Sequence, residues 1–343
     1  STTDSRHPDC LMLLACIIAL VTSALFAWSL SRARGRWLAL DIPNQRSLHN
    51  LPTPRTGGLA ILAGATAGVL THWLVSKQLL LDITSMGAIL TLVAVALIDD
   101  HYHIAAGLRL LVQTSVVALL LISDPAVGPV SLTWLTLLLC LVWGINLYNF
   151  MDGMDGFAAG MAVFGFGTFA LLAWQAGHSE FALGCAIIVA ACSGFLLFNF
   201  PPARLFMGDA GSTVLGLLAG VVILKAHSEA ILPFWLGVLV FSPFIVDASV
   251  TLMARIVRRE RIWQAHKSHY YQRLVESGWG HRKTVLAEYA LMAGCCASAI
   301  LAANLPIAGQ ISVLASWTVL YLSLIHISEP TRQVLVSRMP SSA

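Results

Sequence analysis

The sequence predicts an all-α, polytopic integral membrane protein with about eleven transmembrane helices. Of its 343 residues, 57% are hydrophobic and only 11% are charged, whereas an average soluble domain is about 25% charged. Apolar runs recur along nearly the whole chain, and each is close to the roughly 20 residues that a helix needs to cross a bilayer. Neither β-barrel alternation nor a short repeat is evident. Little polar sequence lies between the runs, so we expect no separate soluble domain.

The predicted helices follow one another in a single membrane-embedded domain over residues 1–327. They cover residues 10–30, 57–75, 79–98, 108–122, 130–148, 156–175, 181–198, 211–224, 231–256, 284–304 and 308–327. The first run could be a signal peptide, but Arg32, Arg34 and Arg36 follow it directly and favour an anchor that stays in the membrane. Residues 324–332 resemble read-through from a vector, so the polar tail over 328–343 is not assumed to be native.

Basic residues indicate which loops face the cytoplasm. One set of alternate loops carries most of the arginines and lysines, whereas the opposite set carries only Arg6, Lys77 and Lys225. The positive-inside rule then places the N-terminus outside and the basic loops in the cytoplasm. The polar motifs described below fall on the same side, although the topology was assigned without them. The formal net charge of +3 is small, and we expect no nucleic-acid partner.

Two adjacent carboxylates, Asp99 and Asp100, end an apolar run at the expected membrane surface. Neighbouring carboxylates repel each other unless a cation or hydrogen bonds compensate their charge. The pair therefore fits a Mg²⁺-linked or proton-handling site. The alternative is that it simply marks a helix end in contact with water.

A second series of polar residues repeats every three positions at the end of the 130–148 helix and beyond it. The series consists of Asn146, Asn149, Asp152 and Asp155. On a helix or helical turn this spacing gives one drifting stripe of oxygen-bearing side chains. Gly153 and Gly156 allow the backbone to approach a phosphate closely or to end the helix. Helix capping would need only one acid, so the series favours a functional site.

A third motif, residues 206–212, precedes another apolar run. Its Asp209 could cap the following helix, whose first backbone N–H groups favour an anion. Asp209 could equally be a Mg²⁺ ligand beside a diphosphate, because Mg²⁺ prefers a few carboxylates together with phosphate oxygens. The sequence leaves both interpretations open.

Basic and aromatic residues are interleaved over residues 255–283, which include His266, Lys267 and His269. Such a segment fits an interfacial helix attracted to anionic lipids. It also fits a clamp in which the histidines donate hydrogen bonds to a diphosphate, although two histidines alone do not make a zinc site. Asp247 lies inside the 231–256 run and is a further candidate, because an acid within the membrane is costly unless it has a function.

In this order the motifs resemble the polyprenyl-phosphate N-acetylhexosamine-1-phosphate transferase family, which includes the phospho-MurNAc-pentapeptide translocase. The resemblance covers about residues 41–283. It rests on a turn-rich loop ending in Pro-Thr-Pro-Arg55-x-Gly-Gly, on Asp99-Asp100, on Asn149-x-x-Asp152-Gly-x-Asp155-Gly and on Phe206-Met-Gly-Asp209-x-Gly-Ser. The ordered set is specific, whereas the pair of acids alone is weak and the loop alone could be merely structural.

The resemblance implies a cofactor and a role for each motif. The cofactor is Mg²⁺, with Mn²⁺ as a substitute, and Asp209 and Asn149 are its implied ligands. The expected catalytic residues are Asp99 and Asp100, which would serve the lipid phosphate, and Asp152 and Asp155, which would shape the nucleotide and metal site. The expected substrate-binding residues are Arg55, Asn146, Asn149, Phe206, His266, Lys267 and His269.

The histidine motif departs from the usual His-x-His-His or His-His-His cluster of the family. Here it is His266-Lys-Ser-His269, which resembles the O-antigen-initiating subgroup that uses fucosamine- or quinovosamine-type sugars. We therefore expect a bacterial inner-membrane enzyme, active at the cytoplasmic face, that transfers N-acetylhexosamine-1-phosphate from a UDP-sugar to undecaprenyl phosphate and releases UMP. Direct attack by the lipid phosphate and a double displacement through an aspartyl-phosphate both stay open.

Three other functions fit parts of the pattern. A phospho-MurNAc-pentapeptide transferase would use the same motifs on another sugar, a lipid-diphosphate hydrolase would need no UDP-sugar, and an ion- or proton-coupled transporter would use the acids as a relay. The expected partners are UDP-N-acetylhexosamine, undecaprenyl phosphate and the lipid bilayer. A homodimer is left open.

Overall fold

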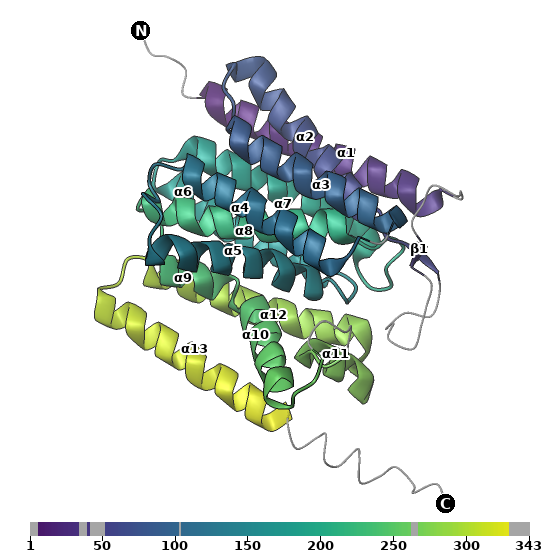
Figure 1. Ribbon diagram of the computed structural model, residues 1–343. Helices are drawn as coiled ribbons and strands as arrows, with labels where there is room; N and C mark the ends of the chain where they lie inside the picture. The colour runs from purple at the N-terminus through teal and green to yellow at the C-terminus, as the bar shows by residue number, and fades with distance from the viewer. Residues whose placement is uncertain (1–5, 34–39, 42–51, 103, 262–266, 329–343) are drawn as a thin grey trace, which may run out of the picture.

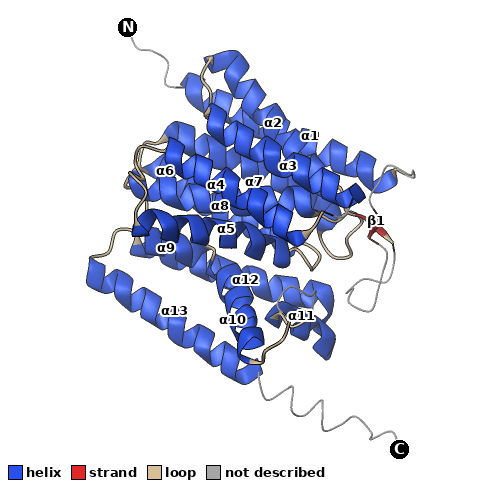
Figure 2. Cartoon of the chain, viewed as in Figure 1, coloured by secondary structure: helices blue, strands red, loops and turns tan. Residues whose placement is uncertain are grey.

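Helices account for almost all of the chain that the computed structural model describes, which is residues 6–33, 40–41, 52–102, 104–261 and 267–328. They pack side by side into one bundle, and one short pair of strands lies beside it (Figures 1 and 2). The prediction of an all-α membrane protein is confirmed. The helices are α1 (Arg6–Arg32), α2 (Gly57–Ser76), α3 (Ile83–Tyr102), α4 (Ala106–Ser123), α5 (Leu132–Phe150), α6 (Phe157–Gln175), α7 (Ser179–Asn199), α8 (Asp209–Ser228), α9 (Phe234–Val240), α10 (Ser242–Val257), α11 (Tyr270–Leu274), the π-helical turn η1 (Val275–Trp279), α12 (Gly280–Ala302) and α13 (Ile307–Ser328).

Nine helices in the described ranges are long and apolar enough to cross a membrane, or ten if the bent pair α9 and α10 counts as one span. The remaining predicted span corresponds to α3, whose apolar part, Ile83–Asp99, is shorter than the others. Each of the eleven predicted runs therefore corresponds to helical structure, but one run is divided between two helices.

That difference is the predicted single helix over 231–256, which is wrong. The structure has two helices here, α9 and α10, bent by 81° at Phe241. Pro243 lies in the first turn of α10 and has no N–H to continue the hydrogen-bond ladder of α9. The bend turns α10 away from the direction of α9, and α10 contributes to the site described below.

The first helix is an integral part of the bundle, because it packs closely against α2 and α7. Ala15, Ala19 and Ala27 have no exposed surface, and Ser23 Oγ donates a hydrogen bond of 2.7 Å to the Ala191 carbonyl of α7. Small residues let these helix backbones approach each other, as is usual for helices packed in a membrane. The first apolar run therefore has a structural role beyond anchoring.

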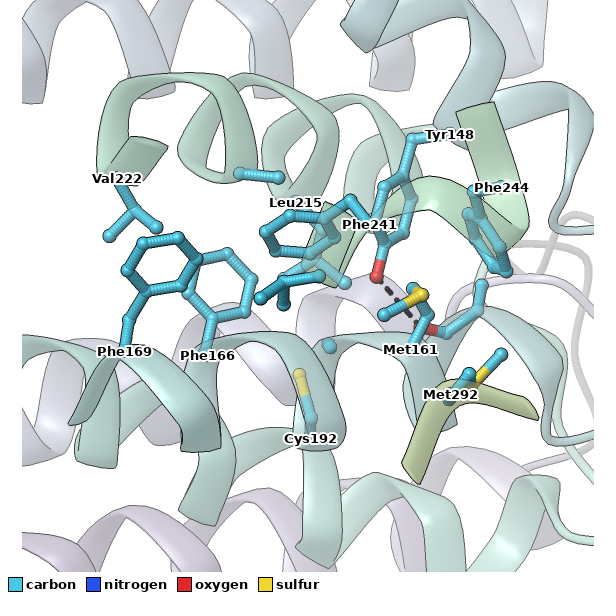
Figure 3. Packing of buried hydrophobic residues seen from close by; sticks show 14 of the residues in the cluster. Tyr148, Met161, Phe166, Phe169, Cys192, Leu215, Val222, Phe241, Phe244 and Met292 are labelled. Carbon is cyan, nitrogen blue, oxygen red and sulfur yellow. Dashed lines mark hydrogen bonds between the residues drawn. The ribbon is translucent and has the colours of Figure 1, made fainter. Parts of the chain in front are cut away.

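Aromatic side chains fill the centre of the bundle (Figure 3). Phe166 and Phe169 pack against Phe241, and Phe244 packs against Tyr148; all five side chains are buried. The Tyr148 hydroxyl donates a hydrogen bond of 2.8 Å to the Ala158 carbonyl. This contact fixes the end of α5 against the start of α6, and so it positions the turn that carries Asp152 and Asp155.

Two glycines of α7 give a matched test of the close packing between α1 and α7. A Cβ at Gly194 would collide with the Leu20 carbonyl of α1, whereas a Cβ at Gly184 meets nothing within 4 Å. Gly194→Ala should therefore cost roughly 1–3 kcal/mol of stability through overpacking. Gly184→Ala should be neutral or stabilising, because alanine favours the helix by about 1 kcal/mol. Thermal denaturation of the detergent-purified variants checks this, and equal stabilisation by both changes would contradict the packing.

Candidate active site

Two cavities lie where α3, α5 and α7 end and where α6 and α8 begin, and their linings share Asn149 and Asp209. The larger one, here called the apolar cavity, has a volume of about 480 Å³ and is lined by Leu92, Val95, Ala96, Asp99, Ala106, Arg109, Val112, Gln113, Trp143, Asn146, Asn149, Phe150, Asp209, Thr213, Ala248, Leu252, His269 and Gln272. The smaller one, here called the polar cavity, has a volume of about 160 Å³ and is lined by Asp41, Arg55, Asn149, Asp152, Gly153, Met154, Asp155, Asn199, Phe206, Gly208, Asp209 and His281. The predicted motifs therefore converge on one place.

A single guanidinium links two of the predicted acids at the edge of the apolar cavity. Arg109 Nη1 lies 2.6 Å from Asp99 Oδ2 and 3.5 Å from Asp209 Oδ2. The other oxygen of Asp99 accepts a hydrogen bond of 2.6 Å from the Ile104 backbone N–H. The arrangement compensates the repulsion between carboxylates of α3 and α8. The side chain of Asp100 lies outside the described residues.

The two asparagines of the predicted series lie in the last turns of α5. Asn146 Nδ2 donates to Gln113 Oε1 at 2.7 Å, and Asn149 Nδ2 donates to Ser212 Oγ at 3.1 Å. These bonds fix the orientation of both side-chain amides. The helix ends at Phe150, so Asp152 and Asp155 lie in the following turn. The single helical stripe that the spacing predicts is therefore interrupted halfway.

Asp155 and Asn199 hold that turn in place. Asp155 Oδ2 accepts from the Ala203 N–H at 3.0 Å, and its Oδ1 lies 3.1 Å from Nδ1 of His281. Asn199 Oδ1 accepts from the Gly156 N–H at 2.9 Å, while its Nδ2 donates to the Leu205 carbonyl at 2.9 Å. The turn after α5 and the loop before α8 are thus bonded to each other.

Asp152 lies in the same turn, outside the membrane-spanning helices. Burial raises the pKa of its carboxyl well above the ordinary value, the nearby Asp209 carboxylate raises that pKa further, and a hydrogen bond from the Gly208 backbone opposes both effects. Two carboxylates this close favour a cation between them, because a cation stabilises their ionised forms. Asp152 and Asp209 therefore form an electrostatically coupled pair.

The loop containing Arg55 reaches the site through backbone hydrogen bonds. The Phe206 N–H donates to the Pro54 carbonyl at 2.8 Å, and the Gly57 N–H donates to the Phe206 carbonyl at 2.8 Å. Strands β1 (Leu40–Asp41) and β2 (Thr53–Pro54) pair antiparallel within this segment, with Asp41 opposite Thr53. The sequence predicted only a turn-rich loop here, because strands of two residues leave no readable pattern.

Asp209 is the first residue of α8, and Gly208 is the N-cap. No side-chain capping bond is formed at this described helix start. The carboxylate of Asp209 lies beside Arg109 and lines both cavities. Asp209 therefore lies one residue past the capping position, and its role as a Mg²⁺ ligand stays a prediction.

His269 belongs to the apolar cavity and is held by the intramembrane acid Asp247. His269 Nδ1 lies 3.1 Å from Asp247 Oδ1, which also accepts from the Tyr270 N–H at 3.0 Å. Asp247 therefore fixes the start of α11 and the position of this histidine. Lys267 pairs with Glu276 at 3.3 Å and is not part of the described lining of either cavity. His266 lies outside the described residues.

Residues 83–227 match the model of glycosyl transferase family 4. The chain is 31% identical over 292 residues to a probable undecaprenyl-phosphate N-acetylglucosaminyl 1-phosphate transferase of Bacillus subtilis (strain 168), and the alignment covers 81% of each chain. The chain belongs to glycosyl transferase family 4.

Two other relatives extend the comparison. A decaprenyl-phosphate N-acetylglucosaminephosphotransferase of Mycolicibacterium smegmatis is 33% identical over 307 residues, which cover 74% of this chain and 73% of the relative. A phospho-N-acetylmuramoyl-pentapeptide-transferase of Halalkalibacterium halodurans is 30% identical over 305 residues, which cover 80% of this chain and 91% of the relative. The family predicted from the motifs is confirmed.

The oxygen donors of this family 4 site fit the Mg²⁺ ion that the resemblance implies. Among the described side chains, no three His, Cys, Asp or Glu residues are arranged to hold a metal by themselves. Mg²⁺, however, is commonly held by one or two carboxylates and completed by water and substrate phosphates. Asp209 and the Asn149 amide, which line both cavities, would supply such a partial set together with Asp152, which lines the polar cavity.

The sequence predictions missed four residues that line the cavities, namely Arg109, Gln113, Asn199 and His281. Arg109 is an arginine at the start of an apolar run on the same predicted side as Asp99, which was a usable signal. His281 is 126 residues from Asp155, and no local pattern connects them.

Gly208 and Gly128 give a matched test of the site geometry. Both have positive φ, +72° and +75°, so alanine strains the backbone at either position. A Cβ at Gly208 would also collide with the Arg55 carbonyl, whereas a Cβ at Gly128 meets nothing within 4 Å. We expect Gly208→Ala to lower transferase activity at least ~10-fold by displacing Arg55 or Asp209, and Gly128→Ala to retain it. Equal activity of the two folded variants would contradict this account.

Proposed function

We propose that the protein transfers N-acetylhexosamine-1-phosphate from a UDP-sugar to undecaprenyl phosphate and releases UMP. The observation that carries the proposal is the meeting of an apolar and a polar cavity at Asn149 and Asp209. The reaction joins a membrane lipid to a water-soluble donor, so it needs one subsite of each character. The names of the relatives, which act on polyprenyl phosphates and amino-sugar phosphates, support the same assignment.

The apolar cavity is proposed to hold the acceptor lipid. Leu92, Val112 and Leu252 give it hydrocarbon walls on three different helices, which suit a prenyl chain. Arg109 lies at the end of these walls and would bind the lipid phosphate, because a guanidinium matches phosphate geometry. Asp99, held by Arg109 and the Ile104 N–H, would orient this arginine.

The polar cavity is proposed to hold the donor nucleotide. Phe206 gives an aromatic surface against which a base can stack, and Arg55 gives a cationic group for the diphosphate. Asp152 and Asp155, in the turn after α5, line the same cavity. The donor's β-phosphorus would then lie toward Asn149 and Asp209, where the acceptor phosphate meets it.

The proposed chemistry is a direct displacement. An oxygen of the lipid phosphate forms a bond to the β-phosphorus of the donor, and the bond from that phosphorus to the UMP oxygen breaks. The second pKa of a phosphate is about 6, so the nucleophile is largely ionised near neutral pH and needs little help from a base. Bound Mg²⁺ would offset the charge on the diphosphate. The protein residues then mainly bind and align the two phosphates.

The proposed donor sugar is based on the histidine motif, and the proposed orientation is based on the predicted topology. We propose a 6-deoxy-N-acetylhexosamine donor, such as a UDP-N-acetylfucosamine or UDP-N-acetylquinovosamine, and a role in initiating O-antigen or a related cell-envelope glycan. The active site is proposed to face the cytoplasm across the bacterial inner membrane. The Bacillus subtilis relative is named for N-acetylglucosamine, so UDP-N-acetylglucosamine belongs in any donor panel.

The test is UMP release by the detergent-purified protein with undecaprenyl phosphate, Mg²⁺ and a panel of UDP-N-acetylhexosamines. We expect release that needs both the lipid and the metal and that one donor supports best. Arg109→Gln and Asp209→Asn should each lower the rate by ~10²-fold or more, because each removes a charge that aligns or stabilises phosphate. Arg258→Gln, at an exposed arginine outside both cavities, should not. UMP release without lipid would indicate hydrolysis of the donor in place of transfer, and no release from any donor would contradict the proposal.

A further inference from the structure

His281 reaches the polar cavity from a helix that is distant in the sequence. It lies in the first turn of α12 and lines the cavity beside Asp155. Gly278 and Gly280, with φ of +100° and +68°, turn the chain from η1 into α12. The turn delivers the histidine to a site built mainly from α5, α8 and their neighbouring loops.

Close packing fixes this position of α12. His281, Val285 and Tyr289 are four residues apart and so share one face of the helix. Val285 is fully buried, and the Tyr289 hydroxyl donates a hydrogen bond of 2.7 Å to the Gly156 carbonyl. The same helix face therefore contacts Asp155 through its histidine and Gly156 through its tyrosine. Packing of α12 in the core therefore fixes the position of His281 at the cavity.

Because carboxylates line much of the polar cavity, a hydrogen-bond donor at the position of His281 would favour nucleotide binding. Four carboxylates line the cavity, whereas Arg55 and His281 are its basic side chains among the described residues. An ionised carboxylate can only accept hydrogen bonds. The phosphate and carbonyl oxygens of a nucleotide need N–H or O–H donors, so the four carboxylates of the lining cannot serve them. His281 is one of the few groups that can.

Asp155 orients the imidazole. Its Oδ1 lies 3.1 Å from His281 Nδ1, and its Oδ2 is held by the Ala203 N–H at 3.0 Å. A carboxylate that engages one ring nitrogen fixes the ring plane and determines which nitrogen faces a ligand. With Nδ1 directed to Asp155, the nitrogen that a ligand in the cavity would meet is Nε2. The Asp155 backbone N–H donates to Nδ1 at 3.4 Å, so Nδ1 accepts in this bond and the ring proton on Nε2 can be donated to a ligand.

We propose that His281 is a binding residue for the nucleotide half of the donor, to which its Nε2 donates a hydrogen bond. Asp155 is then a positioning residue that acts through His281. This inference rests on the proposed function, since it takes the ligand of the polar cavity to be a uridine nucleotide. The accepting oxygen belongs either to the α-phosphate or to the nucleoside, and the experiment separates the two.

Three substitutions at His281 distinguish ligand binding from a structural role. A glutamine amide reaches about as far as Nε2, whereas an asparagine amide reaches only about as far as Nδ1. We expect His281→Ala and His281→Asn to raise the donor KM about 10-fold with little change in the acceptor KM. His281→Gln should recover most of that loss. A purely structural role predicts the reverse order, with asparagine the better replacement and both KM values affected.

His227→Gln is the matched control, because His227 is an exposed histidine in the last turn of α8 and lines neither described cavity. It should leave both KM values unchanged. An unaltered donor KM in His281→Ala would overturn the inference while leaving the proposed function standing.

Calorimetric binding of UMP and of uridine gives a second readout that needs no turnover. Weaker UMP binding in His281→Ala with unchanged uridine binding assigns the contact to the α-phosphate, and weaker binding of both assigns it to the nucleoside. UMP binding that is equal in wild type and His281→Ala, or absent from wild type, overturns the inference. If wild type binds UMP through His281 but releases none from any UDP-sugar, the inference survives and the proposed function fails.

Discussion

The non-helical segments at one end of the bundle satisfy one another's backbone hydrogen bonds, and the candidate site is built on those bonds. Irregular backbone at membrane depth is tolerated only where its polar groups are paired within the protein. Here Phe206 bonds to Pro54, Gly57 bonds to Phe206, and Asn199 joins Gly156 to Leu205. These pairings bring the three motif-bearing segments together, so the acids that they carry have to share one space.

The two proposed substrates require different surroundings. A prenyl chain is stable among hydrocarbon walls, whereas a nucleotide diphosphate requires polar groups and cations. The bend between α9 and α10 brings Ala248 and Leu252 to the apolar cavity, while the turn after α5 gives the polar cavity its carboxylates. Only Asn149 and Asp209 belong to both described linings. In the proposed function, phosphate chemistry at that shared edge would leave each substrate in an environment that suits it.

The sequence was most informative where a single period or a local motif carries the signal. The apolar runs predicted every long helix, because lipid imposes the same requirement on each one. The break at Phe241 was missed although Pro243 marks it, since composition alone does not separate a bent span from a straight one. Arg109 and His281 were missed because their partners lie on other segments of the chain. Contacts such as that between His281 and Asp155 depend on packing, which no local pattern encodes.

The most direct test of the account is the place where the lipid substrate binds. A photoreactive analogue of undecaprenyl phosphate, crosslinked to the purified protein and mapped by mass spectrometry, locates it. The account predicts labels on residues of α3, α4, α5 and α10 that line the apolar cavity, lost in excess undecaprenyl phosphate and retained in excess UMP. Labels confined to the polar cavity, or labels that UMP removes, would contradict the division into two subsites that meet at Asn149 and Asp209.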